Sequence, residues 1–169
     1  GKSGTLHVSV KELGVILTST IVGGELSLAT GVGLSRQMLG GEGIVVCFFG
    51  DGAACEGIFH ESLNLAAVWN LPILYVCENN QWQAFVHRKE TMKIDRISDW
   101  AGRYGMEAET VDGNDVEAVL APEIRAELAG VVQGIGLGPN AGFDDVISAL
   151  RARSGALKET EAALLFLDE

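Results

Sequence analysis

Two short apolar runs separated by a helix-length segment dominate the pattern of hydrophobic and polar positions in this chain. Residues 44–49 (IVVCFF) and 71–77 (LPILYVC) are almost wholly apolar, so each predicts a strand buried on both faces of a sheet. Residues 53–70 between them have helical composition and length. Right-handed crossovers make such strands parallel neighbours or near neighbours. The pattern therefore predicts a βαβ unit in an α/β fold, with a parallel sheet flanked by helices.

The remaining pattern predicts shorter elements on either side of this unit. In chain order these are a loop with a short extended piece over residues 1–20, a helix over 23–38, a surface loop over 81–90, a short helix over 99–104, a strand over 106–111 and a turn at 112–114. Asp112 or Asn114 in that turn is expected to cap a helix that begins near Asp115. Small residues recur at 23, 27, 31 and 35, on one stripe of the first helix. Tight packing inside the monomer and a subunit interface both explain that stripe.

Polar residues follow both long strands, where a parallel sheet brings them to one edge. Gly50-Asp51-Gly52 comes directly after the first strand and Asn80 just after the second, so Asp51 and Asn80 can meet. A carboxylate and a carboxamide offer hard oxygen ligands, which suit Mg²⁺ or Ca²⁺. A helix that starts near Ala53 would add free N–H groups and a positive dipole end, and the glycines would let the backbone turn sharply and approach an anion. Alone, Gly-Asp-Gly is most often a turn; in this setting it predicts a magnesium-diphosphate site.

Composition and charge narrow the class of protein. The chain has 169 residues, 47% of them hydrophobic and 21% charged, which suits one globular domain with one core. A net charge of −11 disfavours nucleic acid and anionic membranes as partners. We interpret Cys47, Cys55 and Cys77 as reduced thiols, because their number is odd and two of them lie in predicted strands. No signal peptide, basic presequence or membrane-spanning run is found, so we expect a cytoplasmic location, or an organelle matrix if a presequence was removed.

The segment from the first strand to the second carries a family resemblance. Residues 50–80, GDGAACEGIFHESLNLAAVWNLPILYVCENN, resemble the thiamine-diphosphate motif in the alpha subunit of the 2-oxo acid dehydrogenases, of the pyruvate, branched-chain and acetoin type. The shared pattern is Gly-Asp-Gly-Ala, a helix with Glu, Asn, Ala and Trp, then Leu-Pro before a strand that ends in Glu-Asn-Asn. Further matches lie at 1–7, 21–24, 104–105 and 111–115. We therefore interpret residues 1–120 as a partial thiamine-diphosphate-binding α/β domain.

The resemblance implies a site for thiamine diphosphate and Mg²⁺, without a catalytic acid or base from this chain. The metal ligands that it assigns are Asp51, Asn80 and the backbone carbonyl of Trp82. The residues that it assigns to the cofactor are Val22 and Gly23 at the aminopyrimidine ring, and Gly50, Asp51, Gly52, Ala53 and Asn80 at the metal and diphosphate.

The activity implied is oxidative decarboxylation of a 2-oxo acid, or cleavage of acetoin, by an oxidoreductase that transfers the acyl group to lipoamide. In the family the glutamate that protonates the aminopyrimidine nitrogen comes from the beta subunit, and a lipoyl acyltransferase core accepts the acyl group. A beta subunit, in a heterotetramer, and that core are therefore the protein partners that the resemblance implies. It also favours a subunit interface for the small-residue stripe. Pyruvate, a branched-chain 2-oxo acid and acetoin all stay open as substrates.

The sequence departs from the family at both ends. The family's alpha subunit has a Tyr-Arg pair that contacts the cofactor, and no Tyr-Arg occurs in this chain. The match fades beyond residue 120, and no histidine follows His87 to supply the family's Gly-His-Ser loop. Residues 133–142 read as a Gly-rich linker, and 144–169 as one or two amphipathic helices broken near 154–155, so 121–169 is predicted to be a divergent helical segment. We expect the isolated chain to be inactive.

Two other functions remain open from the sequence. The first is a catalytically silent module that keeps the cofactor fold and acts through subunit contacts. The second is an unrelated α/β protein that binds Mg²⁺ and a phosphate ester, such as a phosphohydrolase, which would need a second carboxylate cluster near Asp51.

Overall fold

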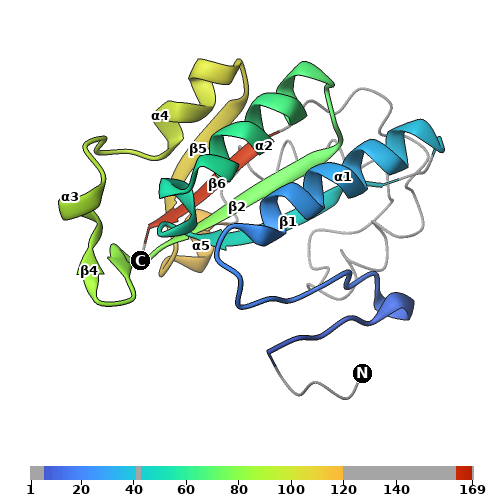
Figure 1. The fold of residues 1–169 in the computed structure, drawn as a ribbon. Coiled ribbons are helices and arrows are strands. Elements are labelled where there is room, and N and C mark those ends of the chain that lie inside the picture. The colour runs from blue at the N-terminus through green and yellow to red at the C-terminus, as the bar shows by residue number, and fades with distance from the viewer. Residues whose placement is uncertain (1–5, 41–42, 120–162, 169) are drawn as a thin grey trace.

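The long strands form one parallel sheet, shown as arrows in Figure 1. The computed structural model describes residues 6–40, 43–119 and 163–168. Across the sheet the strands follow the order β1 (Val45–Gly50), β2 (Ile73–Asn79), β6 (Ala163–Asp168) and β5 (Glu107–Asp112). Each of these neighbouring pairs is parallel. The predicted βαβ unit and the α/β class are therefore confirmed.

Two helices, α1 (Gly24–Met38) and α2 (Gly57–Val68), pack against each other and cover one face of the sheet (Figure 1). The shorter elements are the 3-10 turns η1 (Lys11–Leu13), η2 (Ala53–Cys55) and η3 (Gly102–Tyr104), the helical turns α3 (Arg88–Thr91), α4 (Ser98–Ala101) and α5 (Val116–Val119), and the hairpin strands β3 (Trp82–Gln83) and β4 (Val86–His87). The predicted helices at 23–38 and 99–104 and the predicted strands at 44–49, 71–77 and 106–111 agree with these bounds to within about two residues, the usual uncertainty of element ends.

The core lies between α1, α2 and the sheet. Leu26, Phe59, Leu63 and Tyr75 are each 0% exposed, and full burial of such a side chain contributes about 1.5–3 kcal/mol. The Tyr75 hydroxyl is satisfied inside this core by a 2.9 Å hydrogen bond with the Thr30 hydroxyl. The helix layer is thus anchored on β2, the strand that leads to the candidate site.

The second face of β1 differs from the prediction. Burial alternates along this strand, and Val46 and Phe48 are 43% and 58% exposed. The prediction that β1 is buried on both faces is therefore wrong: its side chains alternate between the helix-covered face and an exposed one. Apolar residues on both faces of a strand make burial of either face possible. They do not show which face another element covers.

The predicted helix over 53–70 is interrupted. Glu56 has an extended conformation, with ψ of 145°, so η2 ends before it and α2 begins only at Gly57. The prediction of a long helix that starts at Ala53 is therefore wrong. Only a single 3-10 turn follows directly after the Gly50-Asp51-Gly52 segment, and the dipole of α2 begins further along the chain.

The predicted surface loop over 81–90 is also wrong. Trp82 pairs with His87 and Gln83 with Val86 in a two-strand antiparallel hairpin, and α3 follows at once. The turn of this hairpin contains Ala84 with a positive φ of 58°. Tight hairpin turns normally use Asn or Gly at such positions. Because neither residue is present in the turn, the sequence carries no recognisable hairpin signal here.

The turn after β5 uses its acidic residues differently from the prediction. The Asp112 carboxylate accepts a hydrogen bond from the backbone N–H of Asn114 at 3.0 Å and so holds the turn itself. The Asp115 carboxylate accepts one from the N–H of Ala118 at 3.1 Å, in the first turn of α5. The cap is therefore Asp115, rather than Asp112 or Asn114.

Strand β6 corrects the prediction for the C-terminal segment. Residues 163–168 form a strand between β2 and β5, with Leu165 in register with Val76 on one side and Glu109 on the other. The helical prediction is wrong for these six residues, because a short apolar run suits a buried helix and a buried strand equally well. The Gly-rich linker at 133–142 and the helices predicted up to residue 162 lie outside the described residues. The domain boundary at 120 stays a prediction.

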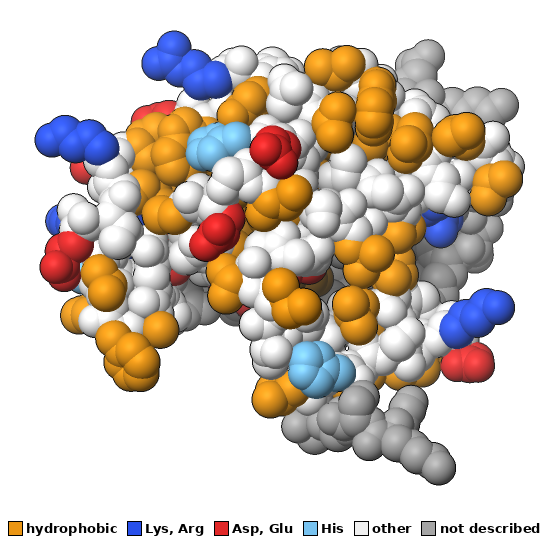
Figure 2. All heavy atoms as spheres, viewed as in Figure 1, with side chains coloured by type: hydrophobic (Ala, Val, Ile, Leu, Met, Phe, Trp, Pro, Cys, Tyr) orange, Lys and Arg blue, Asp and Glu red, His pale blue; other side chains and the backbone are white. Residues whose placement is uncertain are grey.

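The outer face of the helix layer carries scattered apolar side chains, visible as orange spheres in Figure 2. The small residues Ser27, Gly31 and Ser35 of α1 are exposed on this layer and line a shallow depression of about 410 Å³. Only Gly23 of the predicted stripe is packed inside the described chain, so packing within the monomer does not explain the other three. A subunit interface there stays a prediction. None of the helices in the described ranges is long and apolar enough to cross a membrane.

Candidate functional site

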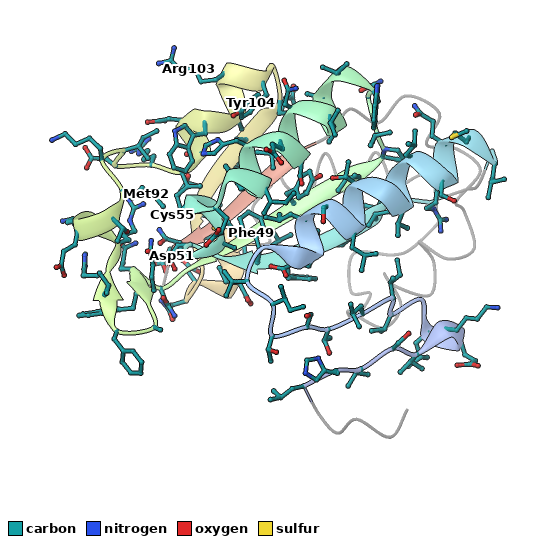
Figure 3. All side chains as sticks on the ribbon, viewed as in Figure 1. Phe49, Asp51, Cys55, Met92, Arg103 and Tyr104 are labelled. Atoms are coloured by element: carbon teal, nitrogen blue, oxygen red, sulfur yellow. The ribbon has the colours of Figure 1, made fainter. Side chains whose placement is uncertain are left out.

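The carboxyl ends of β1 and β2 bring the predicted metal ligands to one edge of the sheet. Gly50 is in register with Glu78, and the backbone N–H of Asp51 donates to the Glu78 carbonyl at 3.3 Å. Asn80 follows directly after the last residue of β2. Figure 3 labels Asp51 at this edge, where β1 ends and the chain turns toward α2. The parallel register therefore places Asp51 and Asn80 on adjacent strand ends, as the sequence predicts.

Asp51 is a buried carboxylate with an unused oxygen. The residue is 2% exposed, and within the described part of the chain its Oδ2 atom has no hydrogen-bond partner. Burial raises the pKa of Asp51 above its usual value, while its own backbone amide and the nearby Arg88 and His87 side chains act in the opposite direction. An unpaired buried carboxylate is unfavourable unless a cation or a proton compensates it. Asp51 is therefore suited to bind a cation at the strand edge.

Such a cation would need several kinds of ligand. Among the described residues, no group of three or more His, Cys, Asp or Glu side chains is placed to hold a metal ion. The remaining ligands would therefore be carboxamide or backbone oxygens, water, or phosphate oxygens of a bound molecule, all of which suit Mg²⁺. The described residues also offer no second carboxylate cluster of the kind that a phosphohydrolase would need.

Asn80 and Trp82 sit on the connection from β2 into the hairpin. The Asn80 Oδ1 atom accepts a 2.9 Å hydrogen bond from the backbone N–H of Trp82, which leaves its second lone pair for another ligand. Gln81 between them has a positive φ of 69°. The Trp82 indole is 54% exposed and meets the His87 ring edge-on at 5.2 Å, so the side chain points away from the core. Only the backbone of Trp82 belongs to the candidate site.

The turn after β1 reaches its shape without strained glycines. Neither Gly50 nor Gly52 has a positive φ, and Gly52 has ordinary helical angles of −61° and −39°. A Cβ added at Gly52 would lie 3.5 Å from the Gln83 side chain, at an ordinary contact distance. The chain does turn at Asp51 and Gly52, but the turn does not use the left-handed conformation that favours glycine. Close approach of the two glycines to an anion stays a prediction. Ala53 is 3% exposed and opens η2 directly behind Asp51.

Val22 and Gly23 lie beside the start of α2. Gly23 caps α1 with a positive φ of 74°, and a Cβ there would lie 2.9 Å from the Ile58 side chain and 3.6 Å from that of Glu56. Val22 is 64% exposed. The structure thus packs this segment on the residues that follow η2, and it leaves the Val22 side chain accessible.

The hairpin and α3 supply residues that the sequence did not reveal. The Gln83 amide donates to the Cys55 thiol at 3.2 Å, and its Oε1 accepts from the Thr91 hydroxyl at 2.8 Å, which ties the hairpin to η2. Arg88 is 4% exposed and binds the Gln81 side chain at 3.0 Å. Arginine is rarely so buried, yet residues 81–90 have no clear period from which its burial could be predicted.

The fold is that of the thiamin diphosphate-dependent enzymes. A transketolase from Leishmania mexicana superposes with a TM-score of 0.57 at 15% identity, over 89% of this chain and 20% of the transketolase. A candidate thiamin diphosphate-dependent enzyme from Mycobacterium smegmatis gives a TM-score of 0.54 at 18% identity, over 91% of this chain and 23% of that protein. At such identities the likeness concerns the fold alone.

The sequence comparison is more specific, and the chain belongs to the dehydrogenase E1 component family, whose sequence model matches residues 1–125. It is 44% identical over 119 residues to the alpha subunit of acetoin:2,6-dichlorophenolindophenol oxidoreductase from Bacillus subtilis, covering 70% of this chain and 36% of that protein. It is 36% identical over 121 residues to the pyruvate dehydrogenase E1 component subunit alpha of Rhizobium meliloti, covering 72% of this chain and 35% of that protein. The predicted family is therefore confirmed, and the chain spans about a third of the length of these curated relatives.

Proposed function

We propose that this chain binds the Mg²⁺ complex of thiamine diphosphate as part of the alpha subunit of a decarboxylating dehydrogenase. The observation that carries the proposal is the buried Asp51 carboxylate, whose Oδ2 has no partner among the described residues, at a strand edge shared with Asn80. Family membership argues against an unrelated phosphate-ester-binding protein. Thiamine diphosphate, when bound, supplies the electron sink for cleavage of the bond next to a carbonyl group.

The residues of this chain would hold and orient that complex. Asp51, Asn80 and the Trp82 carbonyl would ligate Mg²⁺, which takes oxygen ligands in near-octahedral geometry. The turn from Gly50 to Ala53 would face the diphosphate through backbone N–H groups other than that of Asp51, which donates to the Glu78 carbonyl. Burial of Asp51 keeps water from competing at its carboxylate, which strengthens its attraction for the metal.

The aminopyrimidine ring would lie against Val22 and Gly23. Gly23 has a left-handed backbone and approaches Ile58 too closely for a Cβ to fit, so this segment would present its backbone to the ring beside the accessible Val22. We assign no proton transfer to a side chain of this chain. A beta subunit would supply the acidic group that faces the aminopyrimidine nitrogen, so we expect the isolated chain to turn over no substrate.

The reaction that we propose is oxidative decarboxylation of a 2-oxo acid, or cleavage of acetoin, with lipoamide as the acyl acceptor on an acyltransferase core. Identity is higher to the acetoin relative, at 44%, than to the pyruvate dehydrogenase and 2-oxoisovalerate dehydrogenase alpha subunits, at 36% each. Acetoin is therefore the first substrate to test with the assembled enzyme.

Calorimetry of thiamine diphosphate binding tests the proposal, with and without Mg²⁺ and with and without a beta subunit of the same family. We expect saturable binding that requires Mg²⁺ and that Asp51→Ala abolishes. Binding that survives Asp51→Ala would refute the metal assignment. If thiamine diphosphate does not bind even with the beta subunit present, the chain is a silent module that keeps the fold without the cofactor.

A further inference from the structure

Gln81 occupies a strained position between the two hairpin-side metal ligands. Its φ of 69° lies in the left-handed region, which is unfavourable for a residue with a Cβ. This conformation reverses the chain locally, so the Trp82 N–H reaches the Asn80 side chain at 2.9 Å. The backbone of Gln81 therefore sets where the Asn80 carboxamide and the Trp82 carbonyl point.

Arg88 holds Gln81 at two points. The Arg88 backbone N–H donates to the Gln81 carbonyl at 2.9 Å, and the Arg88 Nε donates to the Gln81 Oε1 at 3.0 Å. Glycine would adopt the left-handed conformation without strain, but it would lose the second of these contacts. The glutamine side chain thus stabilises a backbone shape that its own Cβ disfavours.

Arg88 is itself fixed in place. The residue is 4% exposed, its Nη1 donates to the Met92 sulfur at 3.2 Å, and its Nη2 donates to the Asp95 carbonyl. The Met92 N–H also donates to the Arg88 carbonyl at 2.8 Å. A guanidinium anchored in this way is a rigid support, because Gln81, Met92 and Asp95 hold it at the same time from both sides of α3.

We infer that Arg88 is a positioning residue for the metal site, acting through Gln81 on Asn80 and Trp82; this inference rests on the proposed function. Mg²⁺ demands near-ideal octahedral geometry, so ligands that are held in advance lose less freedom when the ion binds. Residues that orient metal ligands typically change metal affinity by about 10–100-fold when they are replaced. The Arg88–Gln81 pair would therefore set affinity without touching the ion.

Gln81 is the better residue to change, because replacement of the buried Arg88 risks the fold itself. Gln81→Leu removes the acceptor of Arg88 Nε at similar volume, and we expect it to weaken Mg²⁺-dependent binding of thiamine diphosphate about 10-fold. Gln81→Glu keeps an oxygen for Arg88 and should stay within about 3-fold of the unmodified chain.

Gln37→Leu is the matched control. The Gln37 amide donates to the carbonyls of Trp69 and Asn70 at 3.1 and 3.2 Å, and Asn70 also has a positive φ, of 48°. This amide thus supports a left-handed residue before β2, at the amino end of the strand and away from the site. Its loss should leave Mg²⁺-dependent binding unchanged.

The experiment is calorimetric titration of thiamine diphosphate, at several Mg²⁺ concentrations, into the full chain with a beta subunit. It is accompanied by hydrogen exchange of the Trp82 N–H without ligand. Faster Trp82 exchange and weaker binding in Gln81→Leu, restored in Gln81→Glu, support the positioning role. Equal binding by the unmodified and Gln81→Leu chains overturns it and leaves the proposed function standing. Failure of the unmodified chain to bind overturns both, and unchanged Trp82 exchange in Gln81→Leu overturns the positioning role by itself.

Discussion

The two halves of the candidate metal site reach their positions by different physical means. On the β1 side, Asp51 is placed by burial, with 2% of its surface exposed at the end of a core strand. On the β2 side, Asn80 is exposed, and its orientation depends on a left-handed Gln81 that Arg88 holds. A left-handed residue with a Cβ costs about 1–2 kcal/mol. The charged ligand of the site is therefore positioned by the core. The orientation of the other ligands is set by the segment that enters the hairpin, which Arg88 holds in place.

This difference predicts two kinds of failure. A change at Asp51 should remove the attraction for a cation and relieve the unfavourable burial of an unpaired charge. A change in the hairpin should leave the charge in place and spoil the alignment of the other ligands. Binding measurements and unfolding measurements, made on the same variants, separate these outcomes.

The largest effect is expected for Asp51→Asn. Loss of the charged ligand should weaken Mg²⁺-dependent binding of thiamine diphosphate at least about 100-fold, since removal of a charged contact costs about 3 kcal/mol or more. The metal-free chain should become more stable by about 1 kcal/mol, because an uncompensated buried charge is removed. Calorimetry and urea unfolding measure the two quantities.

Glu78→Gln is the control for Asp51→Asn, since Glu78 is an exposed carboxylate on the same sheet edge. It should change neither quantity appreciably. A metal-free Asp51→Asn chain that is less stable than the unmodified chain would show that the Asp51 carboxylate already has a stabilising partner.

The pH dependence of binding follows from the raised pKa of Asp51. Below that pKa the carboxyl is protonated, so Mg²⁺ affinity should fall by about 10-fold for each pH unit. The stability of the metal-free chain should move in the opposite direction. Its native state holds the Asp51 proton more tightly than the unfolded state does. The unfavourable effect of this carboxyl on stability therefore grows as pH rises from its ordinary pKa of 3.8 through the raised native pKa.

Calorimetry and urea unfolding between about pH 4 and pH 8 test this prediction. In Asp51→Asn, the part of the pH dependence of unfolding free energy that this carboxyl causes should disappear. If Mg²⁺ affinity stays constant as pH falls to the ordinary pKa range of an aspartate, Asp51 is not the titrating ligand.

Gly23→Ala tests how much the close packing of the α1 N-cap on Ile58 of α2 contributes to stability. Alanine at a φ of 74°, with its Cβ 2.9 Å from Ile58, should destabilise the chain by about 1–3 kcal/mol. Chemical denaturation measures the loss. A stability change below about 0.5 kcal/mol would mean that α1 and α2 separate easily at this point.

Gly52→Ala should have the smallest effect on stability. Gly52 has ordinary helical angles, and an added Cβ would meet Gln83 at 3.5 Å, so the free energy of unfolding should stay within about 0.5 kcal/mol of the unmodified value. Denaturation and calorimetry on the same variant make the test decisive. Reduced cofactor binding at unchanged stability would place the diphosphate directly against Gly52, whereas a large loss of stability would contradict the packing at this turn.

The sequence predicts the part of the molecule that depends on strong local patterns. The runs around Cys47 and Cys77 predict β1 and β2, and parallel pairing alone brings Asp51 and Asn80 to one edge. The resemblance to the family adds the Trp82 carbonyl, which has no chemical signature in a sequence and stays a prediction. These features are predictable because each depends on neighbouring residues or on a general rule of sheet topology.

The parts that escape prediction depend on contacts that no local pattern of residue types records. The hairpin turns at Ala84 without the usual glycine or asparagine, and Arg88 is buried by partners that become visible only when the hairpin is folded. The break at Glu56 and the exposed face at Phe48 are likewise tertiary outcomes. Local propensity cannot reveal them, because tertiary context overrides it.

The place of β6 between β2 and β5 has a consequence for how the chain folds. Leu164 pairs with Tyr75 and with Ala108, so the middle of the sheet joins residues that are far apart in the sequence. Such non-local pairing slows folding. The chain loses conformational entropy when it brings distant residues together, and this loss comes before the contacts that compensate for it. During synthesis β2 and β5 would each expose an unpaired edge until residues 163–168 emerge, so this interval is when association with other strands is most expected.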